Sequence, residues 1–318
     1  MGEVLRVEDL TVYYYTLRGI VRAVENVYLE ASKGELVAIV GESGCGKSTL
    51  GYSILKLVPP PGRILSGRVE IDGVDLLELE GDKLRHARGE LVSMIFQDPF
   101  TTLDPVRKIE EQLVEVLLEH GIPREEAMSR VYELLRSVGL SERLAKMYPH
   151  QLSGGQRQRV SIAAAIALEP RVLVADEPTT ALDVVVQKQI MDLLDRIRRE
   201  TGMAIILITH DIVLAAERAD KIAIMYAGKI VEEGPIDDVL KEPKHPYTEA
   251  LLASVIDIES RKWPQAISGQ PPDLRKPPPG CRFAPRCRYV FDKCREEEPK
   301  LVVAGSRRIA CWLRVEGS

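Results

Sequence analysis

Residues 41–49 read Gly41-Glu-Ser-Gly-Cys-Gly-Lys47-Ser48-Thr49 and match the spacing G-x-x-x-x-G-K-[ST], which predicts a phosphate-binding loop. The loop follows the apolar run Leu36–Val40, a predicted buried strand, and opens the helical pattern Lys47–Leu57. Glycines let backbone amides turn toward a phosphate, and the helix N-terminus adds the positive end of its dipole. The alternative is a chance glycine-rich turn, which the flanking strand and helix argue against.

Two side chains of this loop predict nucleotide chemistry. Lys47 is expected to neutralise the β- and γ-phosphates, and the Ser48 hydroxyl to ligate Mg²⁺. The other nucleotide-binding candidates of the loop are Gly41, Ser43, Gly44, Cys45, Gly46 and Thr49. Cys45 lies near a helix N-terminus, where the pKa of a thiol can be lowered, although a small residue in a serine-like position is the simpler interpretation.

The run Val172-Leu-Val-Ala-Asp176-Glu177 predicts the acidic half of the same site. An apolar strand brings Asp176 to its carboxyl end, where ligands lie in open parallel sheets, so Asp176 suits the Mg²⁺ shell. Glu177 follows directly and is expected to polarise the attacking water. A strand that ends in a solvated acidic turn would be the preferred interpretation if the pair stood alone.

The rest of the chain predicts an α/β protein. Strands at Val172–Ala175, Ala204–Ile208 and Lys221–Tyr226 alternate with helices at Val184–Arg198 and Ile212–Ala219, as in a parallel sheet covered by helices. Further strands are expected within 3–30 and 66–77, a helical insertion at about 105–168, a helix at Pro246–Val255 and a stiff proline-rich linker at 270–280.

Composition limits the class of protein. The chain has 318 residues, 45% of them apolar, and a net charge of −5, which argues against a protein built to hold nucleic acid. Its longest apolar stretches are far short of the roughly 18 residues that span a bilayer, and no secretory signal is visible, so a cytosolic protein is expected. Asn26 is the single asparagine, which weakly indicates a heat-adapted protein.

Leu152-Ser153-Gly154-Gly155-Gln156 resembles the signature sequence of ATP-binding-cassette (ABC) ATPases and lies between the two phosphate-site motifs, as in that family. Other family motifs follow the same order, and the resemblance covers about residues 3–250. They are the Q-loop glutamine Gln97 in Phe96-Gln-Asp-Pro99, the D-loop aspartate Asp183, the switch histidine His210, and an adenine-stacking aromatic, Tyr14, with Tyr13 and Tyr15 as alternatives.

The resemblance implies an ABC-type P-loop NTPase core with an antiparallel β subdomain and a helical subdomain at about 100–168, together spanning 1–250. It implies that Gln97 joins Ser48 and Asp176 around Mg²⁺, and that Glu177, His210, Gln97 and Lys47 are the catalytic residues of ATP hydrolysis. It also implies head-to-tail pairing of two subunits. The amides and hydroxyl of Ser153 to Gln156 would then close over the partner's ATP.

The single cassette and the absence of a long coiled coil favour a transport motor over a soluble ABC ATPase of DNA repair or translation. His245-Pro-Tyr-Thr248 and Gly280-Cys-Arg-Phe-Ala-Pro-Arg-Cys287 resemble the C-terminal extension of oligopeptide/dipeptide importer ATPases. That resemblance implies a different second ATPase subunit, two permease subunits, an extracellular binding protein and a peripheral position on the cytoplasmic membrane face. Di- or oligopeptides are the leading cargo, with oligosaccharides or nickel as alternatives.

Four cysteines of the small extension 251–318 require an explanation, since a reducing cytosol disfavours disulfides. Their spacing, C-x5-C-x6-C-x16-C, lacks the C-x2-C pairs usual for structural zinc. The importer subfamily is known to hold a [4Fe–4S] cluster in this extension, which implies ligation by Cys281, Cys287, Cys294 and Cys311. Zinc, free thiols and disulfides remain the alternatives.

Overall fold

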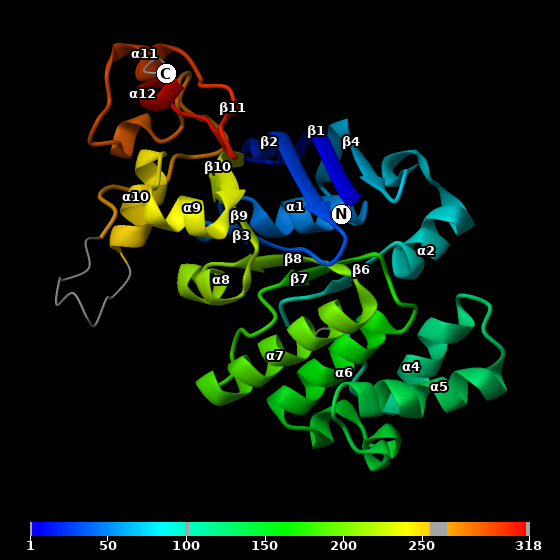
Figure 1. Cartoon of the computed structure of the whole chain (residues 1–318). Coiled ribbons are helices and arrows are strands. Elements are labelled where there is room, and N and C mark those ends of the chain that lie inside the picture. The colour runs from blue at the N-terminus through cyan, green and yellow to red at the C-terminus, as the bar shows by residue number, and fades with distance from the viewer. Residues whose placement is uncertain (1, 99–101, 255–265, 316–318) are drawn as a thin grey trace. The chain divides into compact units, whose positions relative to one another are not determined.

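The computed structural model describes residues 2–98, 102–254 and 266–315, and these form two compact units (Figure 1). Unit 1 contains residues 1–4, 32–34 and 71–206, and unit 2 contains residues 5–31, 35–70 and 207–318. Strand β8 (Ala204–Thr209) includes one of the points at which the chain passes from unit 1 to unit 2.

The core of unit 2 is a sheet built on β3 (Leu36–Val40), every residue of which is buried. β3 pairs in parallel with β9 (Lys221–Tyr226), which pairs antiparallel with β10 (Lys229–Pro235). The carboxylate of Asp220 accepts a hydrogen bond from the Leu36 amide at 2.8 Å and so aligns the starts of β3 and β9. The helix α1 (Lys47–Ile54) follows β3 after the glycine-rich loop. Strand, loop and helix therefore have the order that the sequence predicts.

A second, smaller sheet in unit 2 has the strand order β2-β1-β4. β1 spans Glu3–Thr16, β2 spans Gly19–Ser32 and β4 spans Gly62–Ile71. β1 and β2 bury apolar side chains in partial alternation, which is the pattern of strands with one face on a core. The antiparallel β subdomain expected from the sequence corresponds to this sheet.

The C-terminal residues extend the main sheet of unit 2. β12 (Arg307–Ile309) pairs antiparallel with β10, with Glu232 opposite Ile309, and β11 (Val302–Ala304) pairs with β12. The remaining helices of this unit are α8 (Ile212–Arg218), α9 (Ile236–Lys241), α10 (Pro246–Ala253), η4 (Ala284–Arg286), α11 (Asp292–Glu296) and α12 (Trp312–Val315). In Figure 1 the orange and red tail rises from the yellow β10 and α10 region.

Unit 1 contains a parallel strand pair and a group of helices. β6 (Val92–Ile95) pairs with β7 (Val172–Asp176). Its described residues form the helices α2 (Gly81–Glu90), α4 (Ile109–Leu118), α5 (Arg124–Ser137), α6 (Gly154–Ile166) and α7 (Val184–Thr201), with η1 (Leu76–Glu78), η2 (Glu142–Lys146), η3 (Pro149–Gln151) and the short strand β5 (Val74–Asp75). α4, α5 and α6 contact one another, and Leu113, Leu117 and Val131 are buried among them (Figure 1, green).

The expected strands and helices are present, with ends shifted by a few residues. α10 ends at Ala253, and Val255, which the prediction included, lies outside the described residues. Sequence periodicity missed β6, β10 and β12 because these strands are short or contain buried charged residues such as Glu232 and Glu233. The segment 270–280 is joined to β2, since the Leu274 carbonyl accepts a hydrogen bond from the Arg22 amide at 3.0 Å.

None of the helices in the described ranges combines the length and the hydrophobicity that a bilayer-spanning segment needs.

Candidate nucleotide-binding site

The glycine-rich loop has the backbone that the motif requires. Gly46 precedes α1 as its N-cap with φ 109°, a conformation that L side chains rarely adopt, and no side chain caps this helix end. A Cβ atom at Gly46 would lie 2.1 Å from the carbonyl oxygen of Ala23. The first amides of α1 therefore point into the loop without an intrahelical acceptor, which is the arrangement that binds phosphate.

The side chain of Lys47 folds back across the loop to the carbonyls at its start. Its side chain is 6% exposed, and its ammonium donates to the carbonyls of Gly41 at 2.8 Å and Glu42 at 3.0 Å. Both acceptors are neutral carbonyls, so the positive charge of Lys47 is not cancelled by a carboxylate at these contacts. The loop thus presents a positive charge and helix-terminal amides together, which suits a polyphosphate.

Cys45 is a packed loop residue. It is 5% exposed, and burial raises the pKa of its thiol, with the nearby Lys47 giving a smaller opposing effect. A lowered pKa of this thiol, the less favoured alternative at this helix N-terminus, is not found, because burial outweighs the neighbouring positive charge. The simpler interpretation, a small residue in a serine-like position, agrees with this environment.

Among the three neighbouring tyrosines of β1, Tyr14 contacts the loop. Its hydroxyl lies 3.4 Å from the Thr49 hydroxyl on α1. The ring of Tyr13 instead lies under Arg22, and the ring of Tyr15 under Arg63. This geometry favours Tyr14 as the aromatic residue associated with the loop.

In unit 1, Gln97 and Glu177 contact each other. The Gln97 amide donates to a Glu177 carboxylate oxygen at 2.9 Å, and the Thr180 hydroxyl donates to the same oxygen at 2.9 Å. Glu177 itself has φ 44°, an uncommon conformation for a residue with a side chain. Asp176, at the end of β7, is 1% exposed. The end of β7, the uncommon φ of Glu177 and the two donors thus hold the Glu177 carboxylate in one orientation, directly after the buried Asp176.

The signature residues form the start of α6. Ser153 is its N-cap, with the hydroxyl accepting from the Gln156 amide at 3.3 Å and the Gln156 side chain accepting from the Ser153 amide at 2.9 Å. Gly154 and Gly155 occupy the first turn. A Cβ at Gly155 would lie 2.7 Å from a methyl of Val186, so this turn packs closely on α7.

Asp183 and His210 each occupy a helix entry. Asp183 is the N-cap of α7 and accepts from the Val186 amide at 3.0 Å. His210 lies on the surface of unit 2 between β8 and α8, where Asp211 caps α8 and the Asp211 amide donates to the Thr209 hydroxyl at 3.0 Å. The predicted nucleotide-site residues are thus divided between the units: Gln97, Ser153 to Gln156, Asp176, Glu177 and Asp183 in unit 1, and Tyr14, Gly41, Ser43 to Thr49 and His210 in unit 2.

The four tail cysteines line one small pocket in unit 2. Its wall includes Cys281, Cys287, Cys294 and Cys311 together with His245, Phe283 and Trp312. Burial raises the pKa of the Cys281 thiol to about 12, with a smaller contribution from the other three thiols. All five cysteines of the chain are free thiols, so the disulfide alternative does not apply to the structure. Within the described residues, no group of three or more His, Cys, Asp or Glu side chains meets the geometry of a metal-ion site.

Comparison with known proteins assigns the family. Residues 24–180 match the family described as ABC transporter, and residues 231–294 match the family described as oligopeptide/dipeptide transporter, C-terminal region. The chain is 45% identical to the oligopeptide transport ATP-binding protein AppD of Bacillus subtilis, with 99% of this chain and 98% of that protein covered. It is also 45% identical to the dipeptide transport ATP-binding protein DppD of B. subtilis, covering 99% and 96%.

This chain belongs to the ABC transporter ATP-binding protein family. Among solved structures it resembles the dimeric ATP-binding cassette MJ0796 in a post-hydrolysis state bound to ADP and phosphate. The TM-score is 0.63 and the identity 33%, over 73% of this chain and 98% of that one. The ABC-type P-loop fold expected from the sequence is confirmed, and the chain is an ABC-type ATPase.

Sequence analysis of this ABC ATPase did not predict the roles of a set of residues that together join the glycine-rich loop to the cysteine-rich extension 251–318. They are Glu42 of the loop itself, Tyr226 at the end of β9, Tyr247 on α10, and Phe283 and Arg286 beside the cysteines. Two arginines between Cys281 and Cys287 were a signal, because buried guanidinium groups require carboxylate or carbonyl acceptors. The sequence does not say which acceptors, and the two carboxylates, Glu25 and Glu42, lie 257 and 244 positions away.

Proposed function

We propose that this chain is the ATP-hydrolysing subunit of a membrane importer for di- or oligopeptides. The proposal rests on one observation, the match of residues 231–294 to the C-terminal region of oligopeptide/dipeptide transporters, in a chain that otherwise carries a general ABC cassette. The relatives named for oligopeptide and dipeptide transport support the same substrate class.

The roles of the site residues follow from their chemistry. Lys47 and the loop residues Gly41, Ser43, Gly44, Cys45, Gly46 and Thr49 bind the phosphates, with Tyr14 stacking on adenine. Ser48, Gln97 and Asp176 would hold Mg²⁺, which would supply neutralisation of the phosphate charge. Glu177 orients the attacking water, and His210 stabilises the transferring γ-phosphate.

Two copies of the cassette, this chain and a different second ATPase subunit, pair head to tail in this proposal. The start of α6 presents the amides of Gly154 and Gly155 and the hydroxyl of Ser153, which suit the partner's ATP phosphates. Val184 and Val185 follow Asp183 and are 80% and 67% exposed, so apolar surface adjoins the D-loop aspartate in the single chain. Burial of such side chains favours association.

The remaining partners are two membrane permease subunits and an extracellular solute-binding protein, with this chain bound peripherally to the cytoplasmic membrane face. ATP binding favours the closed pair and hydrolysis favours opening, which is a shift in population driven by differential affinity.

Uptake assays in a strain that lacks this chain test the cargo. Re-expression of the wild type is expected to restore accumulation of a labelled tripeptide, whereas Lys47→Ala is not. Restored uptake of a maltooligosaccharide or of nickel, with no change in peptide uptake, would overturn the peptide assignment and leave the ATPase assignment intact.

The four-cysteine pocket is proposed to hold a [4Fe–4S] cluster. The donor set fits this group, because four free thiols line one pocket and a cubane is ligated by four thiolates. Zinc ligation by the same four thiols is the alternative. The cluster would brace the tail structurally.

Metal analysis of anaerobically purified protein tests the cluster. We expect about four iron and four sulfide per chain and a broad absorption band near roughly 400 nm that dithionite bleaches. Cys287→Ser should lose most of the iron, while Cys45→Ser, the matched control outside the pocket, should retain it. One zinc per chain without colour would exclude the cluster.

A further inference from the structure

A carboxylate lies inside the phosphate-binding loop, at Glu42, and the tail of the protein neutralises it. The guanidinium of Arg286 donates to both carboxylate oxygens of Glu42, at 2.7 and 2.9 Å. This is the bidentate geometry of the strongest ion pairs between side chains. The Arg286 side chain is 4% exposed and that of Glu42 is 26% exposed, so solvent screens the pair little.

The surroundings hold Arg286 in this orientation. Its guanidinium also donates to the Tyr226 hydroxyl at 3.3 Å and to the Ser268 carbonyl at 2.9 Å, and it lies 5.7 Å from the centre of the Tyr226 ring. The Tyr226 ring packs on those of Tyr247 and Phe283, with centroid separations of 4.5 and 5.2 Å. A rigid aromatic group thus orients the guanidinium before any nucleotide binds.

The backbone of Glu42 is engaged as well. Its amide donates to the Tyr247 hydroxyl at 3.0 Å, and its carbonyl accepts from the Lys47 ammonium at 3.0 Å. One residue therefore joins the tail, through Arg286 and Tyr247, to the lysine that the proposed function places on the phosphates. Displacement of Glu42 would alter the position of that lysine.

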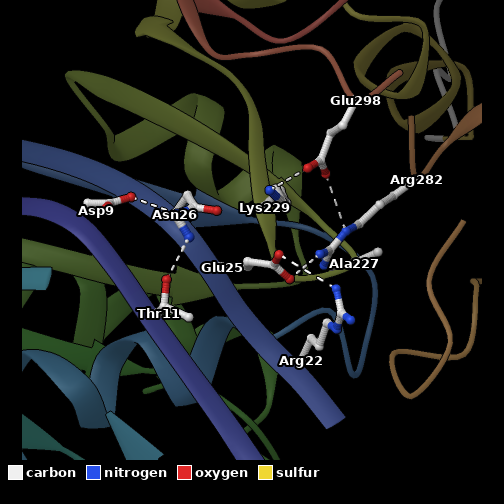
Figure 2. A network of polar contacts seen from close by, with 9 residues as sticks. All are labelled: Asp9, Thr11, Arg22, Glu25, Asn26, Ala227, Lys229, Arg282 and Glu298. Atoms are coloured by element: carbon white, nitrogen blue, oxygen red, sulfur yellow. Dashed lines mark hydrogen bonds and ion pairs between the residues drawn. The ribbon is translucent and has the colours of Figure 1, made fainter. Parts of the chain in front are cut away.

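A second arginine of the same segment binds residues that adjoin the loop. Arg282, which is 5% exposed, donates to the Ala227 carbonyl and to the Glu25 carboxylate, and Glu298 lies 3.6 Å from it (Figure 2). The next amide, that of Gly228, donates to the Cys45 carbonyl at 2.7 Å. Both arginines of segment 281–287 thus bind the loop itself or a residue next to one that contacts the loop.

The charge of Glu42 has a consequence for nucleotide binding. A carboxylate beside a site for a polyphosphate repels the ligand, since like charges at short range in a partly buried site interact strongly. Paired with Arg286, the carboxylate is neutralised and the loop keeps the net positive character that Lys47 and the helix terminus provide.

We propose that Arg286 is a positioning residue of the nucleotide site, which acts by neutralising and orienting Glu42. It deepens the proposed function, since it assumes that the glycine-rich loop binds ATP. It assigns to the cysteine-rich tail a direct part in ATP affinity, in addition to any structural role.

The test compares equilibrium binding of ATP to the purified full-length wild type and to Arg286→Met, Glu42→Gln and the double variant. Arg286→Met is expected to raise the Kd for ATP about tenfold, because it leaves the Glu42 charge uncompensated. This loss should shrink as salt is raised from about 50 to 500 mM, because salt screens the repulsion. Glu42→Gln in the Arg286→Met background should restore most of the affinity, because the repelling charge is gone.

Arg288→Met is the matched control, because Arg288 lies two residues away and pairs with Glu249 on α10. It should keep the wild-type Kd. A wild-type Kd in Arg286→Met, or a double variant as weak as Arg286→Met, would overturn the inference; the second result would mean that Arg286 only holds the tail in place. A wild-type chain that binds no ATP would overturn the nucleotide site itself, and this inference with it.

Discussion

Glu177 is a residue whose backbone and side chain are both constrained. Its φ of 44° costs conformational free energy, and donors from Gln97 and Thr180 fix its carboxylate. A residue held in an uncommon conformation by its neighbours agrees with a role in which orientation matters more than stability. The place of Glu177 directly after Asp176 predicted this residue, whereas its hydrogen bond with Gln97 is visible only in the folded unit 1.

Glu177→Gln is expected to lower the ATP hydrolysis rate at least about 100-fold, because the amide cannot polarise water. ATP binding should persist, since the substitution removes no phosphate-binding group. Steady-state phosphate release and equilibrium nucleotide binding measure the two effects. Lys47→Ala is the comparison variant and should lose binding. Hydrolysis at the wild-type rate in Glu177→Gln would remove this residue from the catalytic role.

Gly46 is constrained by its backbone. Gly46→Ala combines an unfavourable φ with a Cβ that would lie 2.1 Å from a carbonyl oxygen, so we expect at least about 3 kcal/mol loss in the free energy of unfolding and weaker ATP binding. Gly73→Ala is the matched control, because Gly73 has φ 82° but nothing within 4 Å of an added Cβ, and should cost about 1–2 kcal/mol. Urea unfolding measures both, and equal losses would contradict the steric argument.

At the scale of elements, the buried Glu232 connects β10 with α10. Its carboxylate is fully buried and accepts from the amides of Lys244 and His245 at 2.9 Å each, and Arg307 of β12 lies 3.6 Å away. The charged side chain of Glu232 thus accepts hydrogen bonds from the amides just before α10 and pairs with an arginine of the neighbouring strand β12. This explains why the strand lacks the apolar alternation that the sequence analysis looked for.

Glu232→Ala is expected to cost about 3–5 kcal/mol in the free energy of unfolding, because one buried and one partly buried amide lose their acceptor and Arg307 loses one of its two carboxylate neighbours. Chemical denaturation followed by circular dichroism measures the loss. Glu242→Ala is the control, since the Glu242 side chain is 68% exposed and its ion pair with Lys244 lies at the surface. A similar small loss in both variants would show that the buried acceptor is dispensable.

At the scale of the whole molecule, the exposed apolar residues beside Asp183 predict how activity depends on association. Val185→Glu should lower ATP hydrolysis strongly and abolish its rise with protein concentration, because a charge opposes burial at the proposed pair interface. Val303→Glu is the control, since Val303 is 76% exposed on β11. Hydrolysis assays over a concentration series, with sedimentation in ATP, measure this. Rapid turnover by a demonstrated monomer would contradict the shared-site mechanism.

Local patterns accounted for much of the site. The glycine-rich loop, the acidic strand end and the signature helix start are contiguous in sequence, and each has a backbone that its own glycines, caps and strand residues impose. The four cysteines were expected to ligate one metal centre, and they line one pocket. Heat adaptation, inferred from Asn26, stays a prediction.

Two features were not predicted, because burial and long-range backbone pairing have no local signal. They are the burial that raises the pKa of the Cys45 thiol and the hydrogen bond that joins the stiff proline-rich segment to β2. The same holds for the contacts of Arg282 and Arg286, whose acceptors Glu25 and Glu42 lie 257 and 244 positions away. Residue order was enough for the fold, the family and the ATPase assignment, since the motifs behind them depend on short-range geometry and spacing, while the roles of the individual site residues stay predictions. The link between tail and phosphate loop was decided by the packing of β9, α10 and the cysteine segment, because only folding brings those charges together.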